Sequence, residues 1–313
     1  MPGAQPVAAS SASRFAAAVY AGLSKPQKEL PCEYLYDELG SALFEAITML
    51  PEYGLTRADC RAVAKLARDI SPSYARIVEL GSGSGKKTRP ILEALRPSVY
   101  TPIDVSPAAL ARCGAELGAY AKFQPICARY LDGLCQAAMR RAPGERLLLL
   151  FLGSTIGNFD PSARAEFLAQ LRGLLSPGDA LVIGFDLIKP VRAMLAAYDD
   201  PTGVTAAFNL NLLARINREL GAAFKLRNFQ HRARYNRAEQ RIEMHLRSRA
   251  DQSVEIPAAG FTCFLRRGET IWTESSHKFH PRQIPKMARA AGFVHDRMWV
   301  DDCWPLAESL WLA

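Results

Sequence analysis

The chain has 313 residues, 49% of them hydrophobic and 22% charged, and its formal net charge is +8 at pH 7. This composition is ordinary for a globular protein with a sizeable core, and no apolar run approaches the roughly 18–20 residues that span a bilayer, so we expect no membrane partner. The basic residues are spread along the whole chain without a basic run, which favours ordinary surface charge over a nucleic-acid partner.

The cysteines and histidines lack the spacing of a metal site. The seven cysteines form no C-x-x-C pair, and the five histidines form no H-E-x-x-H motif. An odd number of cysteines also argues against a disulfide framework. We therefore expect no metal, and we expect the chain to reside in the reducing cytoplasm.

Regular structure is expected only after an irregular start. Residues 1–14 are rich in Ala, Ser and Pro and predict a flexible leader, because no basic segment precedes an apolar stretch as in a signal peptide. From residue 76, apolar runs predict buried strands at 76–80, 99–105, 122–127, 146–152 and 180–187. Helical spacing predicts helices at 86–95, from Ser106-Pro107 onward, and at 162–175. Such βαβ units build a parallel sheet with helices on both faces.

The pattern changes after residue 190. A long amphipathic helix is predicted at 204–220, followed by one-sided strands at 240–249, 261–265 and 271–279. Residues 281–291 return to helix, and residues 305–312 are expected to supply a last strand. We therefore expect a core of residues 59–190 and 281–313, and a smaller α+β substrate-binding domain of residues 15–58 and 191–280.

The strongest local motif is V-E-L-G-S-G-S-G at residues 78–85, where an apolar strand runs into alternating glycines and then a helix. Glycines allow a sharp turn and a close approach of a ligand to the backbone, and the helix start offers free N–H groups. A dinucleotide site would need glycine where Lys86 stands. With Glu79 before the glycines, the loop resembles motif I of class I methyltransferases, in which it holds S-adenosylmethionine and the acid closing the next strand, here Asp104, binds the ribose. A dinucleotide loop and a purely structural turn are the alternatives.

Several longer motifs resemble the histidine-specific Nα-methyltransferases of ergothioneine biosynthesis. They follow the family order, so that chance agreement is negligible. The motifs are YDELGSALF at 36–44, ITMLPEY at 47–53, TR at 56–57, FLGSTIGNF at 151–159, AYDD at 197–200, GVTAAFN at 203–209, RIEM at 241–244 and TESSHKF at 273–279. The resemblance implies an α/β fold, with a Rossmann-like class I methyltransferase core and a second, smaller α+β domain. It also implies conversion of L-histidine to trimethylated hercynine with three molecules of S-adenosylmethionine.

The same resemblance assigns roles to individual residues. In substrate binding, Asn158 would hold the amine and carboxylate, Tyr198 the carboxylate, and Glu274 with Ser276 the imidazole. The full predicted substrate set is Tyr53, Asn158, Tyr198, Met244, Glu274 and Ser276. The predicted cofactor set is Glu79, Gly81, Gly83, Lys87, Asp104, Ser106, Arg129 and Tyr130. The predicted catalytic set is Tyr36, Tyr53 and Asn158, with Tyr36 or Tyr53 near the attacking amine.

Three positions depart from the family pattern. Gly54 follows Tyr53, where the family often has a second tyrosine. Ser106 stands where some members have a second acid, which puts the ribose contact chiefly on Asp104. The motif near the adenine, often Gly-Asp-Phe, is A-R-Y at residues 128–130.

The assigned residues also have plain structural explanations. Glu274 and Ser276 are two apart on a predicted strand, so they share a face that suits an imidazole, since a carboxylate accepts its N–H and a hydroxyl serves the other nitrogen. The alternative is a solvated strand face. Asn158 follows a buried strand at the edge where α/β sheets bind ligands, or it caps the helix after Asp160. For the others, the alternatives are core packing of Tyr36, Tyr53, Tyr198 and Met244 and a solvated Lys87.

Two other functions are compatible with the scaffold. One is an Nα-methyltransferase acting on another amino acid, and the other is a non-catalytic protein that binds S-adenosylmethionine. A nucleic-acid methyltransferase is weaker, because G-S-T at residues 153–155 replaces an N-P-P-Y-like motif. The expected partner is L-histidine, with no nucleic acid and no membrane, and the chain is expected to be a monomer.

Overall fold

The computed structural model describes residues 11–71 and 73–313, and the chain divides into two compact units. Unit 1 comprises Met1–Glu52, Val191–Asn236 and Ile242–Ser275, and unit 2 comprises Tyr53–Pro190, Arg237–Arg241 and Ser276–Ala313. Each unit has its own sheet. No described helix combines the length and the apolar character that crossing a bilayer requires.

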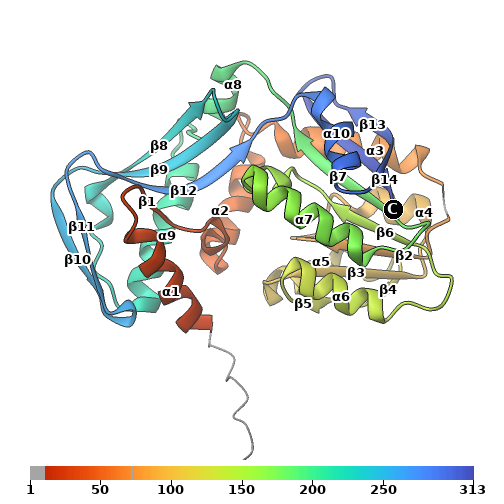
Figure 1. Cartoon of the computed structure of the whole chain (residues 1–313), viewed down its shortest axis with the longest axis horizontal. Coiled ribbons are helices and arrows are strands. Elements are labelled where there is room, and N and C mark those ends of the chain that lie inside the picture. The colour runs from red at the N-terminus through yellow and green to blue at the C-terminus, as the bar shows by residue number, and fades with distance from the viewer. Residues whose placement is uncertain (1–10, 72) are drawn as a thin grey trace, which may run out of the picture. The chain divides into compact units, whose positions relative to one another are not determined.

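Unit 2 is built on one mostly parallel sheet of eight strands (Figure 1). Its strand order is β13-β14-β7-β6-β2-β3-β4, and β5 also pairs with β3. The strands are β2 (Arg76–Leu80), β3 (Val99–Asp104), β4 (Lys122–Phe123), β5 (Ile126–Cys127), β6 (Leu147–Phe151), β7 (Ala180–Asp186), β13 (Val294–Val300) and β14 (Leu306–Leu312). Strands β2 to β7 pair in parallel, whereas β14 runs antiparallel to both β7 and β13. The expected parallel α/β sheet is confirmed, with an antiparallel pair at one edge.

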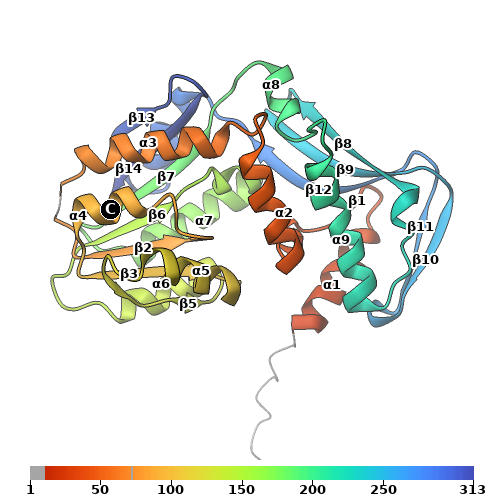
Figure 2. The ribbon, with the colours of Figure 1, turned by 180° about the vertical axis from the view of Figure 1, so that it is seen from behind.

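Helices cover both faces of this sheet, as right-handed crossovers require. One face carries α6 (Tyr130–Met139), α7 (Pro161–Leu174) and α10 (Ile284–Ala290), which share one core cluster with the sheet. The other face carries α3 (Leu55–Asp69), α4 (Arg89–Leu95) and α5 (Pro107–Leu117), which share a second cluster. Figure 1 is viewed from the side of α7 and Figure 2 from the side of α3 and α4.

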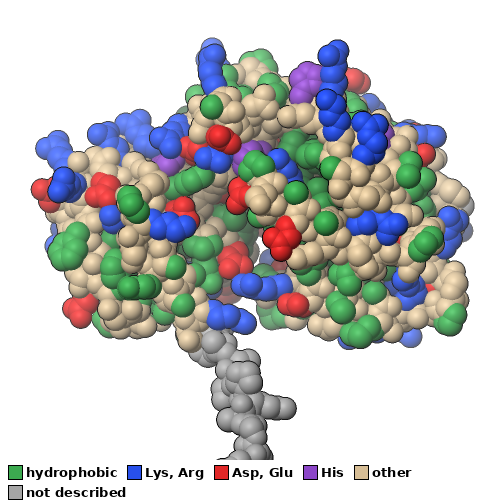
Figure 3. Space-filling view, in the orientation of Figure 1, with side chains coloured by type: hydrophobic (Ala, Val, Ile, Leu, Met, Phe, Trp, Pro, Cys, Tyr) green, Lys and Arg blue, Asp and Glu red, His purple; other side chains and the backbone are tan. Residues whose placement is uncertain are grey.

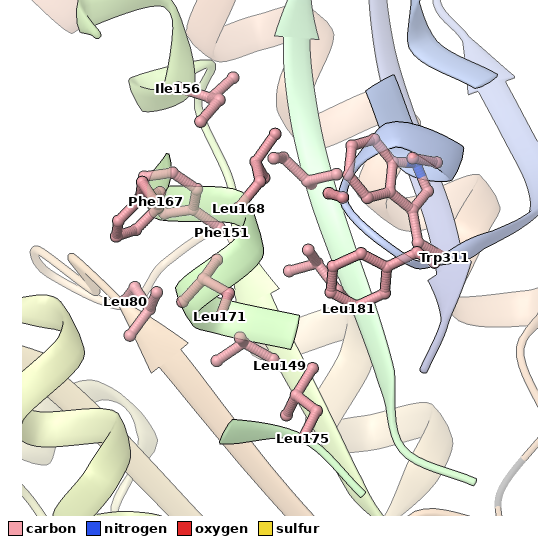
Figure 4. Packing of buried hydrophobic residues seen from close by; sticks show 14 of the residues in the cluster. Leu80, Leu149, Phe151, Ile156, Phe167, Leu168, Leu171, Leu175, Leu181 and Trp311 are labelled. Atoms are coloured by element: carbon pink, nitrogen blue, oxygen red, sulfur yellow. The ribbon is translucent and has the colours of Figure 1, made fainter. Parts of the chain in front are cut away.

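Strand β6 shows why the apolar runs are continuous. Leu149 and Phe151 point into the cluster under α7, whereas Leu148 and Leu150 point into the opposite cluster. Phe167 of α7 packs on Phe151 with ring centroids 5.4 Å apart, within the interdigitated side chains of Figure 4. Because both faces of the sheet are covered, every residue of β6 is buried. Burial of each large apolar side chain stabilises the folded state by roughly 1.5–3 kcal/mol.

Proline and its neighbours set several element boundaries in unit 2. Ser106 caps α5 and Asp160 caps α7, each directly before a proline in the first turn. Helix α4 begins at Arg89, three residues later than the predicted 86, because residues 86–88 form a turn first. The single strand predicted at 122–127 is wrong: Pro125 has no N–H to donate, and the segment divides into β4 and β5.

Unit 1 has a four-stranded sheet, a separate hairpin and three longer helices. The sheet order is β1-β12-β9-β8, and β10 pairs with β11. The strands are β1 (Lys28–Glu29), β8 (Phe229–Asn236), β9 (Arg241–Ser248), β10 (Gln252–Ile256), β11 (Phe261–Leu265) and β12 (Thr270–His277). The helices are α1 (Ser11–Leu23), α2 (Glu38–Met49), the short α8 (Val191–Ala196) and α9 (Val204–Leu220). Helix α9 has the predicted bounds, and Figure 2 shows it beside α2.

Two details of the chain qualify the expected organisation. Residues 11–14 of the predicted leader form the first turn of α1, so that part of the prediction is wrong, and residues 1–10 lie outside the described chain. Strand β12 begins in unit 1, and its last two residues count with unit 2. On the face shown in Figure 3, basic and acidic side chains are interspersed over both units.

Candidate active site

The glycine loop follows β2 and leaves open space above it. Gly81, Gly83 and Gly85 all have positive φ, at +70°, +52° and +77°. A β-carbon at Gly83 would meet nothing within 4 Å, whereas one at Gly81 would lie 3.1 Å from the Tyr130 hydroxyl. The loop therefore presents bare backbone at Gly83, as a cofactor site requires.

The contrast between two of these glycines gives a first prediction. Alanine at Gly85 would place its β-carbon 2.7 Å from Cδ1 of Leu117 and 2.9 Å from Sγ of Cys113. Since both substitutions share the backbone strain, Gly85→Ala is expected to lower the free energy of unfolding by roughly 1–3 kcal/mol more than Gly83→Ala. Gly83→Ala should instead weaken binding of S-adenosylhomocysteine, roughly tenfold or about 1.4 kcal/mol. Urea unfolding and calorimetric titration measure the two effects, and the reverse ranking would contradict the placement of the loop.

Asp104 ties the loop to the neighbouring strand. It ends β3, and its carboxylate accepts from the backbone N–H of Ser106 at 2.9 Å and of Gly83 at 3.3 Å. Burial raises the pKa of Asp104, while these backbone hydrogen bonds act in the opposite direction. Ser106 uses its hydroxyl to cap α5, accepting from Ala109 at 3.3 Å. The carboxylate is thus fixed at the carboxyl ends of β2 and β3, where it suits a ribose.

Glu79 supports the loop from inside the core. Its carboxylate accepts from the Thr88 hydroxyl at 2.7 Å and from the Tyr100 hydroxyl at 2.5 Å. Burial raises the pKa of Glu79 to about 7, although hydrogen bonds from Tyr100 and Thr88 favour the charged form. These contacts join the strands and the helix that flank the loop. A direct contact of Glu79 with the cofactor stays a prediction.

Lys87 belongs to a charged cluster that the sequence did not reveal. Its ammonium lies 2.5 Å from the carboxylate of Asp59 on α3, which is 0% exposed. Although burial acts to lower the pKa of Lys87, Asp59 holds it above its ordinary value. Glu308 of β14 is also fully buried beside Asp59, and burial raises its pKa well above the ordinary range. A β-carbon at Gly153 would lie 2.9 Å from Nζ of Lys87, so the cluster reaches the end of β6.

The two predicted adenine residues lie at the start of α6. Tyr130 packs its ring edge-on against Phe151, with centroids 5.4 Å apart, and its hydroxyl lies over Gly81. Arg129 is the exposed residue that precedes the first turn of the helix. The structure thus brings Tyr130 to the glycine loop, while the contact of either residue with adenine stays a prediction.

Asn158 lies in η2 (Thr155–Asn158), directly after β6. The helix cap that was the alternative role belongs to Asp160, whose carboxylate accepts from Ala163 at 2.9 Å. Asn158 is half-buried, and its side-chain amide makes no hydrogen bond to any of the described residues. His277 holds this turn against β12, since its Nδ1 donates to the carbonyl of Gly157 at 3.0 Å and burial keeps its pKa low. The amide of Asn158 is therefore available to a ligand at the sheet edge.

Ser276 is not on a solvated strand face, because only 4% of it is exposed. Its hydroxyl accepts from the ammonium of Lys278 at 2.8 Å, and the same ammonium lies 2.8 Å from the carboxylate of Asp186 at the end of β7. Lys189 also donates to Asp186. The sequence motif contained Lys278, but its partner Asp186 is distant in the chain and was missed.

Tyr53 is buried, and its neighbour explains one departure from the family pattern. Gly54 stands where the family often has a second tyrosine. A β-carbon at Gly54 would come within 2.3 Å of the Trp304 ring. The indole of Trp304 also donates to Asp186 at 3.3 Å. The bulk of Trp304 thus leaves room for glycine only.

In unit 1, Glu274 and Met244 lie on the adjacent strands β12 and β9. Thr273, next to Glu274, donates its hydroxyl to the carbonyl of Met244 at 3.1 Å, and Met244 is buried. Burial is the main cause that raises the pKa of Cys32 to about 12, and the nearby carboxylate of Glu274 adds to the increase. The half-buried Glu274 therefore lies close to η1 (Cys32–Leu35).

The two remaining tyrosines of the predicted site, Tyr36 and Tyr198, belong to unit 1. Tyr36 contacts Phe208 and Phe44 edge-on, with ring centroids 5.5 Å away in each case. The carbonyl of the buried Tyr198 accepts from Nε2 of His231 at 2.7 Å, and His231 in turn contacts Asn209 of α9. Both tyrosines thus have packing roles, and their contacts with a substrate stay predictions.

The predicted residues fall into two sets. Unit 2 gathers the glycine loop, Asp104, Lys87 and Tyr130 at one edge of its sheet, and it links Asn158 to the Ser276 segment through Gly157 and His277. Unit 1 carries Tyr36, Tyr198, Met244 and Glu274. Within the described residues, no three His, Cys, Asp or Glu side chains are grouped so as to hold a metal ion.

Comparison with known proteins gives a consistent result. The family described as histidine-specific, S-adenosylmethionine-dependent methyltransferases matches residues 15–311. A protein of Mycobacterium tuberculosis named histidine N-alpha-methyltransferase is 41% identical over 301 residues, covering 93% of this chain and 92% of the relative. Ergothioneine biosynthesis protein 1 of Neurospora crassa is 36% identical over 203 residues, covering 62% of this chain and 23% of the relative.

Among solved structures, a methyltransferase of Burkholderia thailandensis with bound 1,6-didemethyltoxoflavin and S-adenosylhomocysteine is 13% identical, with a TM-score of 0.44. The alignment covers 99% of this chain and 93% of that one. The mixed sheet with a parallel centre and helices on both faces agrees with the Rossmann-like core that was predicted. The chain therefore belongs to the family of histidine-specific, S-adenosylmethionine-dependent methyltransferases.

Proposed function

We propose that this enzyme transfers methyl groups from S-adenosylmethionine to the α-amino group of L-histidine, three times, and so makes hercynine for ergothioneine biosynthesis. The family match over residues 15–311 carries the proposal. The buried Ser276 and the available amide of Asn158 support it, because both are polar groups suited to a polar amino acid.

Unit 2 is proposed to bind the cofactor. The open backbone at Gly83 accommodates a ligand, and the fixed carboxylate of Asp104 suits the ribose hydroxyls. Lys87 offers a cation next to the end of β6 for an anionic group of the cofactor. When bound, S-adenosylmethionine supplies a methyl group activated by the positive charge on sulfur.

The substrate residues are proposed to read the two ends of histidine separately. Glu274 accepts an imidazole N–H and Ser276 serves the other ring nitrogen, while Asn158 and Tyr198 hold the α-amine and carboxylate. Met244 forms an apolar wall. Unpaired polar groups in such a site cost roughly 1–3 kcal/mol each, which disfavours amino acids without the imidazole.

The chain needs little acid–base chemistry for this reaction. The neutral amine is the nucleophile, so the α-amino group must lose a proton, to water or to a nearby tyrosine, before each of the three transfers. Holding the amine in line with the methyl carbon does most of the work. Tyr36 or Tyr53 is proposed to lie near the amine, where a phenol oxygen accepts its hydrogen bond. No covalent intermediate is required, so no cysteine has a catalytic role.

A survey of amino acids tests the activity. The full-length enzyme is incubated with S-adenosylmethionine and each of the twenty amino acids, and the products are read by mass spectrometry. Only histidine is expected to gain methyl groups, up to three. Methylation of a different amino acid would favour the second enzyme hypothesis, and cofactor binding without any product would favour the non-catalytic one.

We further propose that the enzyme acts as a monomer in the cytoplasm without a nucleic-acid partner. The cysteine pattern supports a reducing compartment. Light scattering on the purified chain measures the oligomeric state, and a stable dimer would contradict this part of the proposal.

A further inference from the structure

His277, the last residue of β12, contacts the turn that carries Asn158. We propose that His277 is a positioning residue: its ring donates to the carbonyl of Gly157 and so aims the amide of Asn158 at the α-amine and carboxylate of the substrate. The inference rests on the proposed function, because it assumes that Asn158 contacts the substrate. It adds a residue whose effect on the reaction passes through Asn158.

The ring of His277 has one defined proton position. A carbonyl oxygen only accepts hydrogen bonds, so the 3.0 Å contact between Nδ1 and the oxygen of Gly157 places the ring proton on Nδ1. Nε2 is buried without a hydrogen-bond partner among the described residues, and only 4% of His277 is exposed. A proton on Nε2 would therefore be a buried donor without an acceptor, which is unfavourable. The geometry thus favours a neutral ring that donates from Nδ1.

The groups around the ring agree with a neutral His277. Burial is the main cause that lowers its pKa, and the nearby guanidinium groups of Arg164 and Arg241 act in the same direction. The hydrogen bond to Gly157 and the carboxylate of Glu239 act in the opposite direction without cancelling the decrease. Because even an unperturbed imidazole is mostly neutral above about pH 7, the buried ring of His277 is a stable neutral donor under ordinary conditions.

The turn that His277 contacts is anchored at both ends. Ser154 precedes η2 with a left-handed φ of +61°, and its hydroxyl accepts from the backbone N–H of Asp186 at 2.7 Å. At the other end, a β-carbon at Gly157 would lie 2.9 Å from the carbonyl oxygen of His277, so the two backbones are in close contact. The carbonyl of Gly157 and the nitrogen of Asn158 belong to one planar peptide unit. Holding this carbonyl therefore fixes the backbone from which the Asn158 side chain projects.

His277 is itself held by the segment that follows it. The backbone N–H of Lys278 donates to Gln240 at 2.7 Å, and that of Phe279 donates to the carbonyl of Asp186 at 2.9 Å. Asp186 thus bonds through its backbone both to Ser154, at the start of the turn, and to the segment after His277. The ring of His277 is consequently a fixed donor, and all of these residues belong to unit 2.

Two substitutions of nearly equal shape isolate the hydrogen bond. His277→Leu and His277→Asn both remove the outer ring atoms, but only asparagine retains an N–H donor near the place of Nδ1. His277→Leu is expected to lower kcat/KM for histidine roughly 10-fold, because the carbonyl of Gly157 loses its donor and Asn158 is no longer aimed. His277→Asn should stay within about threefold of the wild type, and affinity for S-adenosylhomocysteine should change less than about twofold in both variants.

A double-mutant cycle tests whether the effect passes through Asn158. In an Asn158→Ala background, His277→Leu should lower kcat/KM and histidine affinity by less than about twofold more, because the residue that it positions has lost its amide. Equal losses in both backgrounds would show that His277 acts independently of Asn158 and would overturn the inference. His280→Ala is a control in the same segment: this histidine is exposed, its ring accepts from the N–H of Arg282 at 3.3 Å, and its loss should change kcat/KM less than about twofold.

Nitrogen NMR of the labelled enzyme examines the ring without turnover. At about pH 7.5, the ring of His277 should be neutral with its proton on Nδ1, and its signals are identified by their loss in His277→Asn. A proton on Nε2, or a charged ring, would overturn the inference even if His277→Leu does not fold.

The outcomes separate this inference from the proposed function. Failure of the wild-type enzyme to bind or methylate histidine would overturn the proposed function. Normal methylation by the wild type, together with equal kcat/KM values for folded His277→Leu and His277→Asn, would overturn only the role of His277.

Discussion

Replacing Glu274 with alanine is expected to raise the KM for histidine roughly 10- to 150-fold, which corresponds to losing about 1.5–3 kcal/mol of charge-assisted hydrogen bonding. Affinity for S-adenosylhomocysteine should stay within about twofold, a free-energy change well below 1 kcal/mol. The reason is that Glu274 lies on β12 of unit 1, whereas the glycine loop, Asp104 and Lys87 lie in unit 2. Steady-state kinetics and calorimetry measure the two effects on the same preparation.

Two further variants sharpen the test of Glu274. Glu274→Gln keeps an acceptor oxygen without the charge and should have an intermediate KM. Glu269→Ala is the matched control, because this glutamate precedes β12 in the same unit but pairs with Lys28 at 2.5 Å. Equal losses of histidine and cofactor binding in Glu274→Ala, or a similar rise in KM for Glu269→Ala, would contradict the assigned role.

The second large effect is expected at Asp59. Asp59→Ala should lower the free energy of unfolding by roughly 1–3 kcal/mol, because the half-buried ammonium of Lys87, whose side chain is 30% exposed, loses its counterion. It should also weaken cofactor binding, since Lys87 is no longer held beside the end of β6. Asp302→Ala is the control. The side chain of Asp302 is 89% exposed and its carboxylate lies 3.5 Å from the ammonium of Lys65, so the free energy of unfolding should fall by less than about 1 kcal/mol.

The neighbouring Glu308 should behave as a buried neutral acid. Both of its carboxyl oxygens are buried and lack a hydrogen-bond partner among the described residues. A proton on Glu308 would allow it to donate a hydrogen bond to the neighbouring Asp59. Because the pKa of Glu308 is raised in the folded state, the folded protein keeps this proton while the unfolded chain loses it as pH rises. Wild-type stability therefore falls with pH through this group, and Glu308→Gln, which cannot ionise, should gain stability relative to wild type between about pH 5 and 8. Urea unfolding at both pH values measures the difference, and a gain that shrinks with pH would exclude a neutral Glu308.

Much of the fold follows from local sequence patterns. The five apolar residues of β6 predicted a strand covered on both faces, and the helical spacing at 204–220 predicted α9 with its correct bounds. Ser106-Pro107 marked a helix start because a hydroxyl cap and a proline suit the same place in the chain. The glycine loop was also recognised from local sequence, because the positive φ angles of its turn favour glycine. Long family motifs added the substrate and the reaction.

Tertiary structure decided which side chains meet. Glu79 bonds to Tyr100, Lys87 pairs with Asp59 of another helix, and Lys278 joins Ser276 to Asp186, which lies 92 positions earlier in the chain. In the structure, Asp160 rather than Asn158 caps the helix, so the side-chain amide of Asn158 is available to a ligand. Ser276 is buried, although the sequence was also compatible with a solvated strand face. Periodicity reports only which side of an element is apolar. Pairing of buried charges depends instead on which strand ends and helices the sheet order brings together, and that order is set by long-range packing of the whole core.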